Sequence, residues 1–145
     1  MAIANAPATN GRQPLAAPAR DNRPLVLVVD DEESYRQALA SGLTREGFAV
    51  EAAGDGHEAL RLFHRVHPDL VLLDVMLPGA SGLTVLEQVR RGSRSRDIPV
   101  LVISAFSAES DQRAARSAGA SGFLKKPFDP EELKLLVEDL LGARG

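Results

Sequence analysis

The chain has 145 residues, 44% of them hydrophobic, which is enough for one domain with a single core. Its formal net charge of −3 disfavours a protein whose main role is to neutralise nucleic-acid phosphates, so we expect no direct contact with nucleic acid. It has no cysteine, which excludes disulfides and favours the cytoplasm, and its apolar runs fall short of the roughly 20 residues of a membrane span.

The first segment of the chain, residues 1–23, is rich in Ala, Asn, Pro and Arg. Apart from the first methionine, Ile3 and Leu15 are its only large aliphatic side chains, so it cannot join a core and is predicted to be a disordered tail. It lacks the apolar stretch of a secretory signal, and a flexible leader explains it better than a transit peptide. The folded domain is expected over residues 24–142, with 143–145 as a C-terminal tail.

From Pro24 onward, short apolar runs alternate with segments whose apolar residues recur at helical spacing. In the first helical segment the residues at this spacing are Tyr35, Ala38, Leu39, Gly42 and Leu43. In chain order the predicted strands are 25–29, 48–52, 69–73, 98–103 and 121–124, and the predicted helices are 33–46, 56–66, 82–91, 108–118 and 130–141.

The last helix has the clearest end signals. Asp129 is suited to cap it, Pro130 fits its first position, and Glu132 would complete a capping box. Gly142 is expected to end the helix.

The predicted strands differ in pattern. Three of them, at 25–29, 70–73 and 100–103, are apolar on consecutive residues, which is typical of parallel strands covered by helices on both faces. The strand at 48–52 alternates instead, which predicts an edge position; Phe48, Val50 and Ala52 share one face and Glu51 lies on the other.

Five βα units in a chain this short predict an open, doubly wound α/β fold, because a closed barrel normally needs eight units. We predict a single-domain (βα)5 sheet of five parallel strands in the flavodoxin-like order 2-1-3-4-5. In this order the ligand crevice lies at the carboxyl ends of the first and third strands.

Acidic residues stand at both of these strand ends. Asp30 and Asp31 follow the first strand, and Asp74 follows the third. Carboxylates packed together repel one another, so such a cluster generally needs a cation. Oxygen ligands suit Mg²⁺, which often shares its coordination with phosphate oxygens, and phosphoryl chemistry is therefore the natural use of the site.

A hydroxyl and an ammonium are expected at the same edge. The fourth strand ends at Ser104, and the fifth runs into Lys125, Lys126 and Pro127, so both groups could bind phosphoryl oxygens. Taken singly, most of these residues also suit a structural role, as helix caps, turn residues or loop punctuation. Four strands that deliver acids, a hydroxyl and a lysine to one edge favour the functional interpretation.

Over residues 24–141 the sequence resembles the receiver domain of two-component response regulators, with a fold like that of the chemotaxis regulators. The motifs lie in the family's order and approximate spacing. They are the acidic stretch 28–32 (VVDDE), the phosphoacceptor strand and loop 72–79 (LLDVMLPG), the hydroxyl at 103–105 (ISA) and the lysine-proline turn 123–128 (FLKKPF).

The resemblance implies a metal site and a phosphoacceptor. Asp74 would become an aspartyl phosphate, and together with Asp31 and the backbone carbonyl of Met76 it would bind Mg²⁺. Asp30 would act on the metal through water.

The resemblance also implies how the phosphoryl group is recognised. Lys126, which directly precedes the proline, would contact it, while Lys125 would be solvated. The peptide bond between Lys126 and Pro127 would be cis. Ser104 and Phe123 would be the switch residues, the former moving to the phosphoryl oxygen and the latter turning inward.

In function, the resemblance implies a bacterial signalling switch rather than an enzyme, one that assists its own phosphorylation and dephosphorylation. The donor would be a sensor histidine kinase or a histidine phosphotransfer protein. The output would be a changed partner-binding surface on the fourth helix, fifth strand and fifth helix, read by a downstream protein or an output domain. A phosphorylation-dependent homodimer is compatible with this function, and no membrane partner is expected.

Two alternatives stay open at this point. Residues 54–59 (GDGHEA) fit the dinucleotide pattern G-x-G-x-x-A after a strand, although that strand is half polar and Asp55 and Glu58 suit helix caps. The other is a receiver-like scaffold that is never phosphorylated, against which the full set of acids, hydroxyl and lysine speaks.

Overall fold

The computed structural model of the chain describes residues 22–75, 81–92, 96–105 and 108–144. Within these ranges strands and helices alternate, as predicted. The strands are β1 (Leu25–Val29), β2 (Ala49–Ala53), β3 (Leu70–Asp74), β4 (Val100–Ser104) and β5 (Gly122–Lys125). The helices are α1 (Glu33–Arg45), α2 (Gly56–Val66), α3 (Gly82–Arg91), α4 (Glu109–Ser117) and α5 (Pro130–Arg144).

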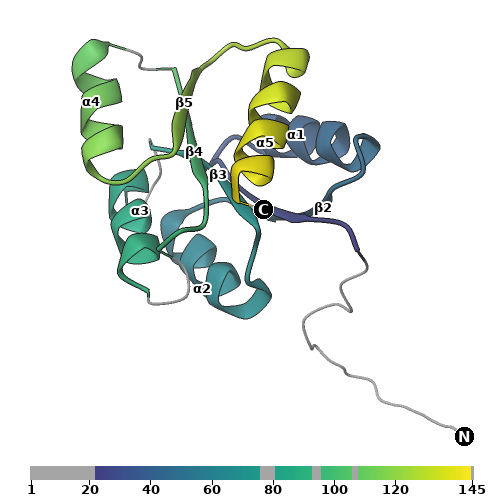
Figure 1. The fold of residues 1–145 in the computed structure, drawn as a ribbon, viewed down its shortest axis with the longest axis horizontal. Coiled ribbons are helices and arrows are strands. Elements are labelled where there is room, and N and C mark those ends of the chain that lie inside the picture. Colours follow the sequence, from purple (N-terminus) through teal and green to yellow (C-terminus); the bar gives the residue numbers. More distant parts are fainter. Residues whose placement is uncertain (1–21, 76–80, 93–95, 106–107, 145) are drawn as a thin grey trace, which may run out of the picture.

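The strands form one parallel sheet in the order β2-β1-β3-β4-β5, which confirms the predicted flavodoxin-like topology. Helices α1 and α5 lie on one side of this sheet, and α2, α3 and α4 lie on the other (Figure 1). β1 is hydrogen-bonded to β2 on one side and to β3 on the other, so the order in which strands are added to the sheet reverses beside β1. The carboxyl ends of β1 and β3 therefore flank the crevice in which such folds bind ligands.

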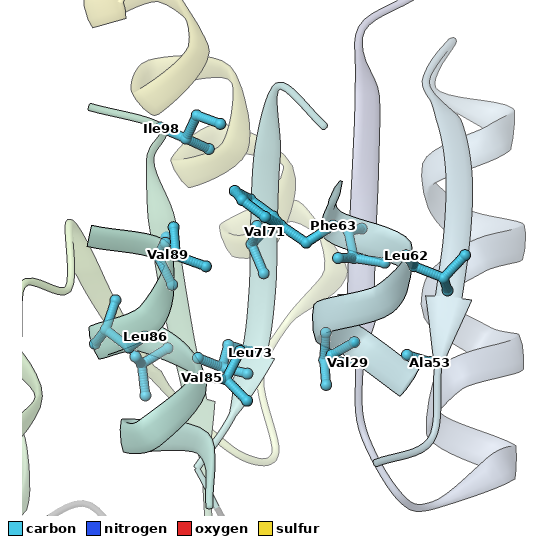
Figure 2. Close-up of a cluster of buried hydrophobic side chains, with 14 of the residues drawn as sticks. Val29, Ala53, Leu62, Phe63, Val71, Leu73, Val85, Leu86, Val89 and Ile98 are labelled. Carbon is cyan, nitrogen blue, oxygen red and sulfur yellow. The ribbon is translucent and has the colours of Figure 1, made fainter. Parts of the chain in front are cut away.

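Two apolar clusters hold the layers together, one on each face of the sheet. The first joins the sheet to α2, α3 and α4, and its side chains point from both layers into the space between them (Figure 2). The second joins the sheet to α1 and α5. Every residue of β1, β3 and β4 is buried, as expected for central strands covered on both faces.

The edge position of β2 is confirmed. The face predicted to carry Phe48, Val50 and Ala52 is only partly covered by helices. Phe48 is buried and Val50 is half-buried against the cluster of α1 and α5, whereas Ala52 is exposed. Ala53, on the other face, is buried in the cluster of α2, α3 and α4. The strand thus packs against helices on both sides, and its alternation does not mark a solvated face.

Two details of the helices also differ from prediction. Ala38 of α1 is exposed, and the burial of that helix rests on Leu39 and Leu43. The prediction that Gly142 ends α5 was wrong, because the helix continues to Arg144 and takes in part of the expected C-terminal tail. A glycine ends a helix by adopting a left-handed conformation, and Gly142 has no positive φ angle.

The start of α5 agrees with the prediction at Asp129 and Pro130, while the capping box with Glu132 stays a prediction. Pro130 is its first residue, and the Asp129 carboxylate accepts a hydrogen bond of 2.9 Å from the backbone N–H of Glu131. No helix within the described ranges has the length and apolar character needed to cross a membrane.

Candidate functional site

The three acidic residues of the predicted crevice do converge. Asp30 directly follows β1, Asp74 is the last residue of β3, and one carboxylate oxygen from each of Asp30, Asp31 and Asp74 lies within 4.8 Å of the others. Asp30 is fully buried and Asp74 is 5% exposed, whereas Asp31 is exposed to solvent. The convergence follows from the topology, because the carboxyl ends of neighbouring parallel strands meet at one edge of a sheet.

Asp30 is held by hydrogen bonds on several sides. Its backbone N–H donates to the carbonyl of Ala53 at 3.1 Å, and its own carbonyl accepts from the Arg36 guanidinium at 2.8 Å. Its Oδ1 accepts from the backbone N–H of Glu32 at 2.9 Å, where α1 begins. The Glu32 side chain itself makes no capping hydrogen bond to α1.

Lys126 lies between the buried carboxylates. Its Nζ donates to Asp30 Oδ2 at 2.6 Å and to Asp74 Oδ2 at 2.9 Å, and only 8% of the residue is exposed. Burial acts to lower the pKa of Lys126, but the hydrogen bonds and negative charges of Asp30 and Asp74 raise it above its usual value. The lysine is therefore a permanent positive charge inside the acidic cluster.

The lysine-proline turn has the predicted form. The peptide bond between Lys126 and Pro127 is cis, and Lys125 is exposed, as the resemblance implied. The backbone N–H of Lys126 donates to the carbonyl of Ser104 at 2.8 Å, which ties the turn to the end of β4.

The donor set suits a divalent cation. Three carboxylates and one ammonium leave two negative charges, and hard oxygen ligands at a crevice fit Mg²⁺ better than a softer metal. Asp30, Asp31 and Asp74 could therefore hold a metal. Met76, whose backbone carbonyl was expected to be a further ligand, lies outside the described residues.

The two predicted switch residues lie on β4 and β5. Ser104 is the last residue of β4 and is fully buried. It follows Ile103, which is paired with Asp74 across the sheet. Phe123 is half-buried, pairs with Val102 and packs against the cluster of α2, α3 and α4.

The close approach at Gly82 was not predicted from the sequence. A Cβ on this first residue of α3 would lie 2.4 Å from the Cα of Val75 and 2.5 Å from the carbonyl oxygen of Asp74. Its N–H donates to the carbonyl of Val75 at 3.1 Å. Only glycine lets α3 approach the end of β3 so closely. The one sequence feature that could have indicated this is that glycine, a poor helix former, stands at the first position of the helix.

Glu32, which precedes α1, and Tyr35 in α1 also reach the site. Glu32 Oε1 lies 3.5 Å from Lys126 Nζ, and the same Nζ lies 4.1 Å from the ring centroid of Tyr35. Helical spacing placed Tyr35 on the apolar face of α1, but it could not show that the lysine, from the other end of the chain, packs on its ring.

The dinucleotide-like segment at the start of α2 acts as a helix cap. Asp55 Oδ1 accepts from the backbone N–H of Glu58 at 2.8 Å, and Glu58 Oε1 accepts from that of Gly54 at 2.9 Å. The Arg36 guanidinium covers Gly54, where an added Cβ would lie 3.0 Å from its Nη1. The backbone N–H groups of Gly54 and Glu58, which a pyrophosphate would need, already donate hydrogen bonds to side chains, and this disfavours a dinucleotide site.

The fold and the site together define a class: a flavodoxin-like α/β domain with an acidic, lysine-bridged centre at the carboxyl ends of β1 and β3. Within this class, the chain belongs to the response regulator receiver domain family, whose model matches residues 26–138. The receiver domains of this family are signalling switches of two-component systems.

Similar solved structures support the assignment. The chemotaxis response regulator CheY4 of Vibrio cholerae is 32% identical, with a TM-score of 0.78, over 82% of this chain and 99% of that one. The receiver domain of the Francisella response regulator 1452 is 28% identical, with a TM-score of 0.79, over 85% of this chain and 100% of that one.

Curated relatives are longer. The response regulator MprA of Mycolicibacterium vanbaalenii is 44% identical over 80% of this chain and 49% of its own length. The protein ycf27 of Porphyridium aerugineum, described as a probable transcriptional regulator, is 40% identical over 80% of this chain and 47% of its own length. The chain thus spans about half the length of these relatives. The expectation of no nucleic-acid contact finds no support in them.

Proposed function

We propose that the chain accepts a phosphoryl group on Asp74, in the presence of Mg²⁺, and thereby switches a surface that binds a partner. The donor is the phosphohistidine of a sensor histidine kinase or of a histidine phosphotransfer protein. The observation that carries the proposal is the ammonium of Lys126, which bridges Asp30 and Asp74 within the buried acidic cluster. A positive charge fixed at a carboxylate is what a transferring phosphoryl group needs.

In the transfer step, an oxygen of the Asp74 carboxylate attacks phosphorus, and the bond from phosphorus to the histidine nitrogen breaks. The leaving imidazole keeps the electron pair and takes up a proton. With acetyl phosphate as donor, the phosphorus–oxygen bond breaks and acetate leaves. Lys126 already donates to Asp74 Oδ2 and would donate to a phosphoryl oxygen after transfer.

The acidic residues divide the task of holding the metal. Asp31 is the exposed carboxylate and would bind it directly with Asp74, while Met76 would add its backbone carbonyl. Both oxygens of Asp30 already accept hydrogen bonds, from Lys126 and from the N–H of Glu32, which favours its action through water. When bound, Mg²⁺ would offset negative charge on the phosphoryl oxygens.

Phosphorylation would add a charge of about −1.5 to −2 at the end of β3. The Ser104 hydroxyl, at the end of the neighbouring strand, would move to a phosphoryl oxygen, and Phe123 would turn inward behind it. The surface of α4, β5 and α5 would then change its affinity for a partner. Reversal would use water as the attacking group, with the same charges of Lys126 and the metal assisting, so the switch promotes both steps on itself.

The partner belongs to the proposal as well. One curated relative is described as a probable transcriptional regulator, so the output includes control of transcription through an attached domain or a downstream protein. A phosphorylation-dependent homodimer would be one form of this output. We place the reaction in the cytoplasm, where sensor kinases present their phosphohistidine.

The test is incubation with Mg²⁺ and acetyl phosphate, followed by intact-protein mass spectrometry. Wild type should gain one phosphoryl group, and a chelator should prevent it. Asp74→Asn should gain none, whereas Asp139→Asn, at an exposed position on α5, should behave like wild type. No adduct on wild type would leave an unphosphorylated scaffold, and an adduct on Asp74→Asn would disprove the assignment of the acceptor.

A further inference from the structure

The aromatic ring of Tyr35 lies against the ammonium of Lys126. Tyr35 lies in the first turn of α1 and is half-buried, and its ring centroid is 4.1 Å from Lys126 Nζ. The ring of Phe128 packs against Tyr35 with centroids 5.9 Å apart and an interplanar angle of 53°. An ammonium at this distance from an aromatic face makes an attractive cation–π contact, and this one is largely shielded from water.

The Tyr35 ring differs from the buried carboxylate partners of Lys126, because it takes no part in metal binding or phosphorylation. Asp30 and Asp74 are the carboxylates that a metal would share, and Asp74 is also the proposed acceptor. The Glu32 side chain is 60% exposed and 3.5 Å away, so its attraction is weakened by solvent. Of the contacts that the described residues show for the Lys126 ammonium, those with the Tyr35 ring and the exposed Glu32 carboxylate involve no predicted metal-site residue, and the ring is the partner shielded from solvent.

We propose that Tyr35 is a positioning residue that holds the Lys126 ammonium over the acidic cluster while Asp74 exchanges partners. The inference rests on the proposed function, because the exchange takes place when Asp74 is phosphorylated. Tyr35 does not touch the reacting atoms, and it acts through the lysine alone. Phe128 supports this role, since its ring packs against that of Tyr35.

The composition supplies a direct spectroscopic readout. Tyr35 is the one tyrosine of the chain, and there is no tryptophan, so near-ultraviolet fluorescence excited above the phenylalanine band reports on this ring. Mg²⁺ alone would draw the Asp74 carboxylate away from Lys126, so that the less neutralised ammonium makes a stronger contact with the ring that holds it. Titration with Mg²⁺ should therefore change the tyrosine emission, and Lys126→Met should remove most of this change.

The kinetic test compares two substitutions at Tyr35. Tyr35→Phe keeps the ring face and should keep the wild-type rate of phosphorylation by acetyl phosphate. Tyr35→Leu keeps an apolar side chain but loses the ring, and its rate should fall about three- to tenfold. Far-ultraviolet circular dichroism would show that both variants are folded, and Leu135→Ala, at an exposed position of α5, controls for substitution as such.

The outcomes separate this inference from the proposed function. Phosphorylation of Tyr35→Leu at the wild-type rate, with Asp74→Asn unmodified, would overturn the inference and leave the proposed function intact. Equal losses in Tyr35→Phe and Tyr35→Leu would assign the role to the hydroxyl and also overturn it. If wild type accepts no phosphoryl group, the proposed function fails, and a tyrosine emission that Mg²⁺ leaves unchanged would independently refute the contact.

Discussion

Replacement of Lys126 by methionine should destabilise the protein, and the reason lies in the charges around it. The ammonium is the positive partner of Asp30 and Asp74, at 2.6 and 2.9 Å, and both carboxylates are buried. Methionine has a similar length and fills a similar volume, so the main change is the loss of charge. The two buried carboxylates would then repel each other without compensation.

The size of the effect follows from the burial of the pair. Removal of one partner from a buried ion pair costs about 3–5 kcal/mol, because the remaining charge stays desolvated. For a domain of this size, that corresponds to a fall in Tm of about 10–20 °C. Mg²⁺ should restore more stability to Lys126→Met than it adds to wild type, because the cation replaces the missing positive charge.

Thermal and urea unfolding, followed by circular dichroism with and without Mg²⁺, would measure both effects. Lys125→Met is the matched control, since the neighbouring lysine is exposed and its loss should change stability by less than about 0.5 kcal/mol. Asp30→Asn combined with Lys126→Met should recover part of the lost stability. If Lys126→Met is as stable as Lys125→Met, then Lys126 does not stabilise the protein by balancing the buried charges of Asp30 and Asp74.

Three further predictions concern the stability of the fold, and each can be checked by urea unfolding. Gly82→Ala should lower the free energy of unfolding by about 1–3 kcal/mol, because its Cβ would lie 2.4 Å from the backbone after β3; a neutral result would contradict this close approach. Arg90→Met should cost about 1–3 kcal/mol, since it removes hydrogen bonds to two backbone carbonyls, whereas the exposed Arg91→Met should not. Asp55→Ala should cost about 1 kcal/mol through the lost cap of α2, and no loss would mean that water replaces the cap.

Much of the fold could be predicted because its signals are local. Consecutive apolar residues in β1, β3 and β4 indicate strands covered on both faces, and helical spacing marks the segments between them. The predicted bounds of α2 and α3 agree with the structure. Element ends were harder, as α5 shows, because a glycine stops a helix only if the backbone turns there.

Asp30, Asp31 and Asp74 could be brought together from the sequence alone. Their positions at strand ends, combined with a parallel topology, are sufficient, because neighbouring parallel strands end at the same edge. The same reasoning brought Lys126 to that edge. Which of the carboxylates would be buried, and that one lysine would bridge two of them, depends on side-chain packing and could not be read from spacing.

The contacts that shape the site in detail came only from the tertiary structure. Tyr35 and Lys126 come from opposite ends of the chain, and their contact depends on how α1 and the turn after β5 pack beside each other. Gly82 is required because α3 meets the backbone of Asp74, a distance that no periodicity encodes. The sequence by itself determined which chemical groups reach the crevice, since strand ends and residue types are local properties. Packing between distant segments decided how those groups are held.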